Sequence, residues 1–264
     1  MGKSKVEARD NNLNILGRWI RDVLMAAFFL TRLPIQLNED SEKRQLADVA
    51  WAFPVVGIFV GGLAGLALLI GFQLGLHPLA CGLFAVITQV FVTGALHEDG
   101  LADVADGFGG GYKVADKLRI MRDSHVGSYG VLALVFSVTL RAGLIAGMAT
   151  PTMAVLALIS AGAVSRSLVA GVMNQLEMAR REGLATGAGK PTNEATLAAL
   201  GLGAAAAFLL LGASGWIVLA VAFGAAVMTG LLAKRQIGGQ TGDVLGTTQQ
   251  VTEAAVLLSV VAVM

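Results

Sequence analysis

The stretch FPVVGIFVGGLAGLALLIG, residues 53–71, carries no charged side chain and decides the fold. A transmembrane helix needs about 20 consecutive, mainly apolar residues. Hydrophobic residues make up 55% of the chain and charged residues only 14%, which excludes an ordinary soluble domain. We therefore predict an all-α, polytopic transmembrane bundle of about 6–7 spanning helices. The predicted spans are 50–73, 79–97, 129–149, 152–175, 195–212, 215–233 and 249–264, the last of which is short enough to be re-entrant.

The N-terminal region has a different pattern. Residues 12–36 have the periodicity of an amphipathic helix, with apolar side chains on one face and polar side chains on another. Their longest apolar run is too short to span a bilayer. We predict an amphipathic helix that lies in the membrane interface with Trp19 at headgroup level and ends before Pro34. A soluble helix packed on the membrane domain is the alternative. The predicted division is therefore residues 1–48, an interfacial helix and cytoplasmic loop, and residues 49–264, the transmembrane catalytic domain.

The net charge and the cysteine content exclude several classes of protein and site. The net charge of +1 argues against a nucleic-acid binder, and the single cysteine, Cys81, excludes an intrachain disulfide. Apart from Arg141 and Arg166, charged residues fall in segments that share one side of the membrane, and no acid is expected in the middle of a span. Because loops rich in Lys and Arg stay in the cytoplasm, we expect the polar segments to face it.

The strongest candidate for a site is HEDGLADVADG, residues 97–107. On a helix Asp99, Asp103 and Asp106 share one face, so their repulsion favours a bound cation. We predict a Mg²⁺ site completed by substrate phosphates, with Glu98 as a further ligand and His97 or a carboxylate as the base. Glycines at 107, 109, 110 and 111 would let an anion approach the backbone. A solvated acidic helix end is the alternative.

Two arginines fall inside predicted spans. A central arginine costs roughly 2.5–3.5 kcal/mol on insertion scales, so Arg141 and Arg166 must face protein or water. We predict that both point into a polar cavity that also receives the acidic cluster, where they offset the charge of a transferred phosphoryl group. Snorkelling or a purely structural ion pair is the alternative for each.

Other polar segments supply candidate substrate contacts. One precedes the span at 129–149, one is the loop at 177–194, and one is the glycine-rich loop that begins at residue 238, where Thr247 and Gln250 predict a capping box opening the last helix. The loop glycines could bring backbone amides to an anion. For Lys190 and His125 the alternative is that they are ordinary solvated loop residues without a role in binding. The predicted substrate-binding residues are Asp123, Ser124, His125, Gly127, Lys190, Thr241, Asp243 and Gln249.

These motifs resemble the cobalamin synthase family of adenosylcobinamide-GDP ribazoletransferases. The resemblance rests on His-x-Asp-Gly-x-x-Asp-x-x-Asp-Gly at 97–107, Asp-Ser-x-x-Gly at 123–127 and Gly-x-Thr-Gly-Asp-x-Leu-Gly at 239–246. Thr-Arg-Leu-Pro at 31–34 and Phe-Pro-Val-Val-Gly at 53–57 also fit. The acidic pattern is similar, more loosely, to that of CDP-alcohol phosphotransferases, but their Asp-Gly-x-x-Ala-Arg is missing because Asp103 follows Ala102.

The resemblance implies a multi-pass enzyme of the bacterial cytoplasmic membrane with Mg²⁺ as cofactor. It implies transfer of adenosylcobinamide phosphate from adenosylcobinamide-GDP to α-ribazole or its 5′-phosphate, with release of GMP. Phosphoryl transfer of this kind depends mainly on positioning and charge neutralisation. Assembly of identical chains is compatible with the sequence. A secondary transporter is the alternative function, because intramembrane ionisable residues also serve substrate pathways.

Overall fold

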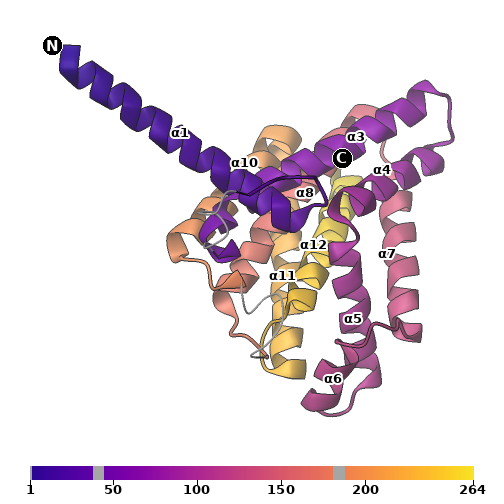
Figure 1. The fold of residues 1–264 in the computed structure, drawn as a ribbon. Coiled ribbons are helices and arrows are strands. Elements are labelled where there is room, and N and C mark those ends of the chain that lie inside the picture. The colour runs from indigo at the N-terminus through magenta and orange to yellow at the C-terminus, as the bar shows by residue number, and fades with distance from the viewer. Residues whose placement is uncertain (1, 38–44, 181–187) are drawn as a thin grey trace.

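The computed structural model of the protein describes residues 2–37, 45–180 and 188–264, and most of these residues form helices (Figure 1). The described residues contain no strand, and Met178 and Gln240 form an isolated bridge. The predicted all-α architecture is confirmed. The elements are α1 (Gly2–Leu30), η1 (Leu46–Ala52), α3 (Phe53–Gln73), α4 (Pro78–Thr93), α5 (Leu96–Gly110), α6 (Val114–Ile120), α7 (Ser128–Ala146), α8 (Pro151–Gln175), α10 (Asn193–Leu211), η2 (Gly212–Ser214), α11 (Gly215–Ile237) and α12 (Gly242–Val263).

The described helices include five segments long and apolar enough to cross a membrane, or six if the bent pair of α4 and α5 counts as one span. One of the five holds two helices, α10 of 19 residues and α11 of 23 residues, which the sequence predicted as separate spans. The chain is therefore a multi-pass membrane protein. The five segments are Leu46–Gln73, Ser128–Ala146, Pro151–Gln175, Asn193–Ile237 and Gly242–Val263.

The predicted span at 79–97 is wrong in one respect, because the chain bends by 92° between α4 and α5. Gly94 ends α4 in the left-handed region with φ 63°, and Ala95 follows with φ 58°. The Arg32 side chain packs against Gly94, where a Cβ atom would lie 2.3 Å from Cγ of Arg32. The acidic stretch therefore begins a separate helix.

The last helix begins earlier than predicted, at Gly242 in place of 249. The Thr241 hydroxyl caps it by accepting a hydrogen bond of 3.3 Å from the backbone N–H of Val244. The predicted capping box at Thr247 and Gln250 is thus wrong, and both residues lie inside α12. Gly246 is tolerated in the helix because it packs against His97, whose Cα would be 3.3 Å from an added Cβ.

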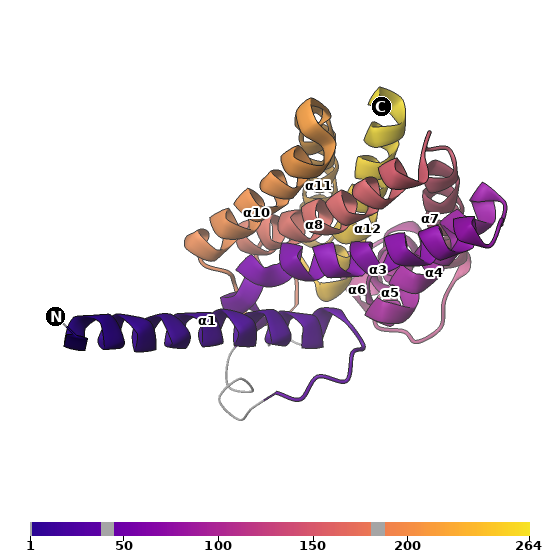
Figure 2. The same cartoon turned by 90° about the horizontal axis from the view of Figure 1, so that it is seen from above.

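The core is built on close contacts between α3 and α8, which run side by side (Figure 2). A Cβ atom on Gly57 would lie 2.0 Å from the carbonyl oxygen of Gly162, and one on Gly61 would lie 2.4 Å from that of Leu158. Only glycine allows this separation. These glycines, spaced four residues apart, therefore let the two helices approach closely.

Helix α1 starts before the predicted residue 12 and stops at Leu30, and its N-terminal half projects from the bundle (Figure 1). Its inner face packs on η1, where Nε1 of Trp51 donates a 3.0 Å hydrogen bond to Asp22. Large apolar side chains remain exposed on α1. The interfacial location and the division at residue 48 stay predictions. The exposed apolar residues are Leu16, Trp19, Ile20, Leu24, Phe28 and Phe29.

Candidate active site

Carboxylates from α5 and from the start of α12 meet on one side of the bundle. Asp103 interacts electrostatically with Asp243 as well as with Asp99 and Asp106 of its own helix. The two helices can come this close because Gly100 faces the backbone of Asp243, and an added Cβ would lie 2.8 Å from its carbonyl oxygen. Asp99 is exposed and Asp103 and Asp243 are half-buried, so the group is accessible from outside.

Arg180 lies beside these carboxylates, and sequence reasoning missed it. The segment after α8 pairs with the segment before α12, where Ala179 N–H donates to Gln240 O and Gln240 N–H donates to Glu177 O, both at 2.8 Å. This pairing brings Nη2 of Arg180 to 3.2 Å from Oδ2 of Asp243. Within the described part of the chain, its buried Nη1 has no hydrogen-bond partner. The adjoining residues 181–187 lie outside the described residues.

The predicted contacts of Thr241 and Asp243 also fall in this region. The Thr241 hydroxyl lies 3.1 Å from Oδ2 of Asp243, the same oxygen that faces Arg180. Thr241 is buried and caps α12, so it fixes the carboxylate at the helix N-terminus. A helix N-terminus favours negative charge.

Asp106 has a different environment from Asp99 and Asp103. Its Oδ2 accepts a 2.7 Å hydrogen bond from Gly127 N–H and its Oδ1 accepts one of 2.9 Å from Gly130 N–H, at the start of α7. A Cβ atom on Gly127 would lie 2.5 Å from this carboxylate. Asp106, which was predicted as a metal ligand, therefore contacts Gly127, which was predicted as a substrate contact, and this contact anchors α5 to α7.

The two intramembrane arginines lie in a buried charge network. Arg141 Nη2 is 3.0 Å from Glu98 Oε1, Arg141 Nη1 is 3.3 Å from Glu253 Oε1, and Arg166 Nη1 is 4.0 Å from Glu253 Oε2. All four side chains are at least nine-tenths buried. Both arginines thus form buried ion pairs, which were the alternative in the sequence analysis.

The expectation that no acid lies in the middle of a span is wrong. Glu253 sits halfway along α12 because that helix starts seven residues before the predicted boundary. Glu98 is buried beside Arg141, so its carboxylate is directed into the bundle and not toward Asp99. Its Oε1 also accepts a 3.0 Å hydrogen bond from Gln250, while its buried Oε2 has no hydrogen-bond partner among the described residues.

His97 and Gln249 extend the same network. His97 is buried and interacts electrostatically with Arg166 and Arg141. The Gln249 amide donates to Glu253 and, at 3.3 Å, to the Ser165 hydroxyl. Both predicted site residues therefore lie inside the bundle, against the ion pairs and not at the exposed carboxylates.

The remaining predicted contacts are exposed and dispersed. Asp123, Ser124 and His125 lie in the connection before α7, and a hydrogen bond from His125 lowers the pKa of the Asp123 carboxyl. Lys190 Nζ pairs with Glu177 Oε1 at 2.7 Å. Among the residues that the structure describes, none of these four contacts Asp103.

Three of the four glycines after the acidic stretch are used for packing. An added Cβ would lie 2.5 Å from Met121 at Gly107, 2.8 Å from Tyr129 at Gly109 and 2.6 Å from Lys117 at Gly111. Only Gly110 has room, with its nearest neighbour at 3.6 Å. Glycine at three of these positions is therefore required by packing, and the approach of an anion to this backbone stays a prediction.

Within the described ranges, no three His, Cys, Asp or Glu side chains already converge closely enough to hold a metal ion. Mg²⁺ is commonly held by one or two carboxylates, with phosphate oxygens and water completing the coordination. A pair of accessible carboxylates such as Asp99 and Asp103, facing a third at Asp243, fits an ion of this kind in its donor chemistry.

Fold and site together define a multi-pass membrane protein with carboxylates and an arginine gathered at one end of its helices. The family model described as cobalamin-5-phosphate synthase matches residues 22–261. This chain therefore belongs to the cobalamin-5-phosphate synthase family.

Curated relatives match along nearly the whole chain. One named adenosylcobinamide-GDP ribazoletransferase, from Mesorhizobium japonicum, is 43% identical over 94% of this chain and 95% of its own length. A relative of the same name from Bradyrhizobium diazoefficiens is 42% identical over 90% and 92%. Another from Azorhizobium caulinodans is 43% identical over 92% and 96%. No solved structure matches this chain.

Proposed function

We propose that this chain is an adenosylcobinamide-GDP ribazoletransferase. It transfers adenosylcobinamide phosphate from adenosylcobinamide-GDP to α-ribazole or its 5′-phosphate, releases GMP, and forms adenosylcobalamin or its 5′-phosphate. The observation that carries the proposal is the meeting of Asp99, Asp103 and Asp243 beside Arg180. The names of the relatives supply the substrates.

Mg²⁺ is the proposed cofactor, held by Asp99 and Asp103 with Asp243 as a third donor. When bound, it would neutralise charge on the diphosphate. We leave Glu98 out of this set because it is buried against Arg141. We leave Asp106 out because both of its oxygens accept backbone hydrogen bonds.

The side chains perform positioning and proton transfer. Arg180 offers Nη1, which has no hydrogen-bond partner among the residues that the structure describes, to a phosphate oxygen. The Asp103 carboxylate takes the proton of the ribose 3′-hydroxyl as the hydroxyl oxygen bonds to the phosphorus atom next to cobinamide. The bond from this phosphorus to the bridging oxygen of the diphosphate breaks, and GMP departs with the bridging oxygen. We assign this base role to Asp103 and not to His97, because His97 is buried in the bundle.

Arg141 and Arg166 are proposed to act at a distance from the reacting atoms. Glu98 lies next to Asp99 on α5, and Glu253 lies on the helix that begins beside Asp243. The ion pairs through Arg141 therefore join the two helices that carry the proposed ligands. These ion pairs fix the position of Asp99 and Asp103 on α5 relative to Asp243 on α12.

The site is proposed to face the cytoplasm of a bacterial cytoplasmic membrane. Basic residues on α6 and at the end of α11 lie together, because Lys117 contacts Gln236 (Figure 1). Loops rich in Lys and Arg remain in the cytoplasm. Both polar substrates would then reach the site from the compartment where nucleotides are made.

The test is release of GMP by purified protein in detergent. Wild-type protein should release GMP with Mg²⁺, stop when EDTA is added, and recover when Mg²⁺ is returned. Asp103→Asn should lower turnover by at least about a hundredfold, because general-base catalysis contributes about 10²–10⁴-fold. Asp116→Asn on α6 is the matched control and should retain activity and thermal stability.

Near-normal turnover of a folded Asp103→Asn variant would overturn the assigned site. The second candidate, a secondary transporter, is favoured by one observation, the buried ionisable residues in the bundle. Substrate flux into sealed vesicles without chemical change would support the transporter and refute the transferase.

A further inference from the structure

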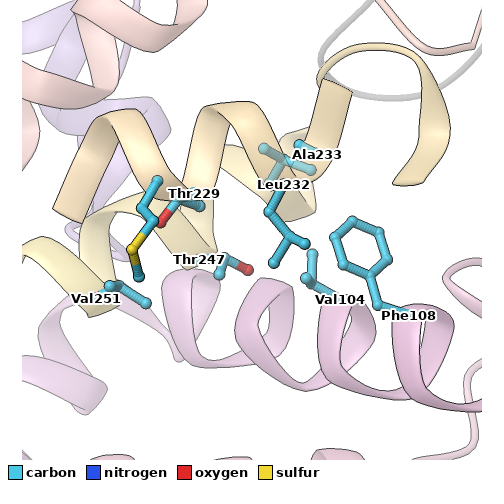
Figure 3. Close-up of a pocket in the computed structure, with 9 residues that line it drawn as sticks. Val104, Phe108, Thr229, Leu232, Ala233, Thr247 and Val251 are labelled. Carbon is cyan, nitrogen blue, oxygen red and sulfur yellow. The ribbon is translucent and has the colours of Figure 1, made fainter. Parts of the chain in front are cut away.

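A cavity of about 330 Å³ lies between α5, α11 and α12 (Figure 3). Small-molecule sites typically measure about 300–1,000 Å³ and are lined mainly by apolar side chains. No charged side chain lines this one. The lining residues are Val104, Phe108, Met228, Thr229, Leu232, Ala233, Val244, Thr247 and Val251.

The cavity shares backbone with the proposed catalytic carboxylates. Val104 directly follows Asp103, and Val244 directly follows Asp243. The Thr247 hydroxyl joins the two helices at this point, since it lies 2.9 Å from the carbonyl oxygen of Asp243 and 3.0 Å from that of Gly100. A flat group held in the cavity would therefore leave an attached sugar near the carboxylates.

The hydroxyl groups in the lining already donate their hydrogens. Thr229 donates a 3.0 Å hydrogen bond to the carbonyl oxygen of Ala225, and Thr247 donates to the helix carbonyls named above. The cavity thus offers no charge and no free hydroxyl donor. Such a site cannot stabilise the polar edge of guanine or a phosphate group, because these groups would lose their hydrogen bonds to water without gaining others.

We propose that this cavity binds the base of the nucleoside acceptor, an apolar base of the benzimidazole class. The inference rests on the proposed function, in which ribazole, a ribonucleoside of a methylated benzimidazole, supplies the attacking hydroxyl. Its base has no exocyclic polar group to satisfy. The aromatic ring of Phe108 and the side chain of Met228 give it polarizable neighbours.

The cavity opens on the outer surface of the helical bundle. Met228 is 71% exposed and Leu232 is 46% exposed, so the cavity opens toward the apolar outer surface of α11. In a membrane protein that surface faces lipid, and a lipid acyl chain is the competing occupant. The experiment has to separate these two sources of apolar contact.

The perturbation is Val251→Trp, which fills the cavity from α12. Leu258→Trp is the matched control, since it places the same side chain two turns along the same helix, at a site that is 51% exposed and outside the cavity. Phe108→Leu is a second variant that removes the aromatic ring with little change in volume, in case Val251→Trp fails to fold.

Two measurements are made on each protein in detergent, the dissociation constant for α-ribazole by calorimetry and the KM values for both substrates from GMP release. Val251→Trp should raise the dissociation constant and the KM for ribazole by about tenfold or more, because pockets discriminate small apolar groups by about 10–200-fold. The KM for adenosylcobinamide-GDP should stay within about twofold of wild type, as a base subsite alone requires. Phe108→Leu should weaken ribazole about three- to tenfold, and Leu258→Trp should change neither constant.

The outcomes are distinguishable. Unchanged ribazole binding in folded Val251→Trp and Phe108→Leu would overturn the cavity assignment and leave the transferase proposal standing. The assignment is equally overturned if Val251→Trp alters only the dependence of activity on added phospholipid, since the occupant is then a lipid chain. Ribazole binding that Val251→Trp weakens, in a protein that releases no GMP, would support the cavity and refute the transferase.

Discussion

Replacing Arg141 with methionine tests the buried charge network most directly. Arg141 is 1% exposed and contacts Glu98 at 3.0 Å and Glu253 at 3.3 Å. Without it, two buried carboxylates share only Arg166, which is 4.0 Å from Glu253. Removing one partner of a buried pair typically costs about 3–5 kcal/mol, because the remaining charge stays desolvated. We expect Arg141→Met to lower the free energy of unfolding by that amount.

A double variant separates charge balance from lost packing. Glu98→Gln combined with Arg141→Met removes one charge of each sign and leaves Glu253 paired with Arg166. The double variant should therefore be more stable than Arg141→Met alone, with a coupling energy of about 1–3 kcal/mol. Arg119→Met, at an exposed position on α6, is the control and should change stability by less than about 0.5 kcal/mol.

The assay is unfolding of the detergent-solubilised protein by added SDS, followed by circular dichroism. Each variant is compared with wild type at the same protein and detergent concentrations. If the double variant loses as much stability as the two single variants added together, the carboxylates are not coupled through Arg141. That result would refute a charge network joined through Arg141.

Three further predictions concern packing, capping and the membrane. Gly57→Ala should cost about 1–3 kcal/mol or more in unfolding free energy, because its Cβ would meet the α8 backbone at 2.0 Å, whereas Gly62→Ala, with open space around it, should be tolerated. Asp106→Asn should cost about 1–2 kcal/mol by weakening the cap of α7, which thermal melts would detect. In a variant whose other tryptophans are phenylalanine, Trp19 fluorescence should be quenched by brominated lipid; no quenching would contradict an interfacial α1.

Helix positions followed from the sequence where an apolar run coincides with a strong boundary. The predicted span 152–175 matches α8 (Pro151–Gln175), where Thr150 caps the helix and Pro151 opens it. The predicted span 50–73 matches the end of α3 at Gln73. Hydropathy failed at Gly94 because an apolar run continues through the bend, where Gly94 and Ala95 both have a positive φ. Arg32 packs on Gly94 and its N–H donates a 2.7 Å hydrogen bond to Val92 O.

Site residues followed from the sequence only where spacing along one helix carries the information. The shared face of Asp99 and Asp103 could be predicted from their separation. The partners of Arg141 could not, since Glu98 is 43 positions away and Glu253 is 112 positions away. Arg180 gave no local signal either, because the backbone pairing of residues 177–179 with Gln240 is what brings it to Asp243.

The bend between α4 and α5 explains why an acidic helix can be part of this bundle. Helix α4 has 16 residues, about 24 Å at 1.5 Å per residue, which is shorter than the hydrocarbon core of about 30 Å. A straight continuation would cross the remaining depth of about 6 Å within about four residues and would carry Asp99 and Asp103 out of the bundle along the axis of α4. The 92° turn instead lays α5 against α12. The same turn directs Glu98 inward to Arg141 and leaves Asp99 exposed beside the start of α12, so a single backbone feature separates the structural carboxylate from the proposed catalytic ones.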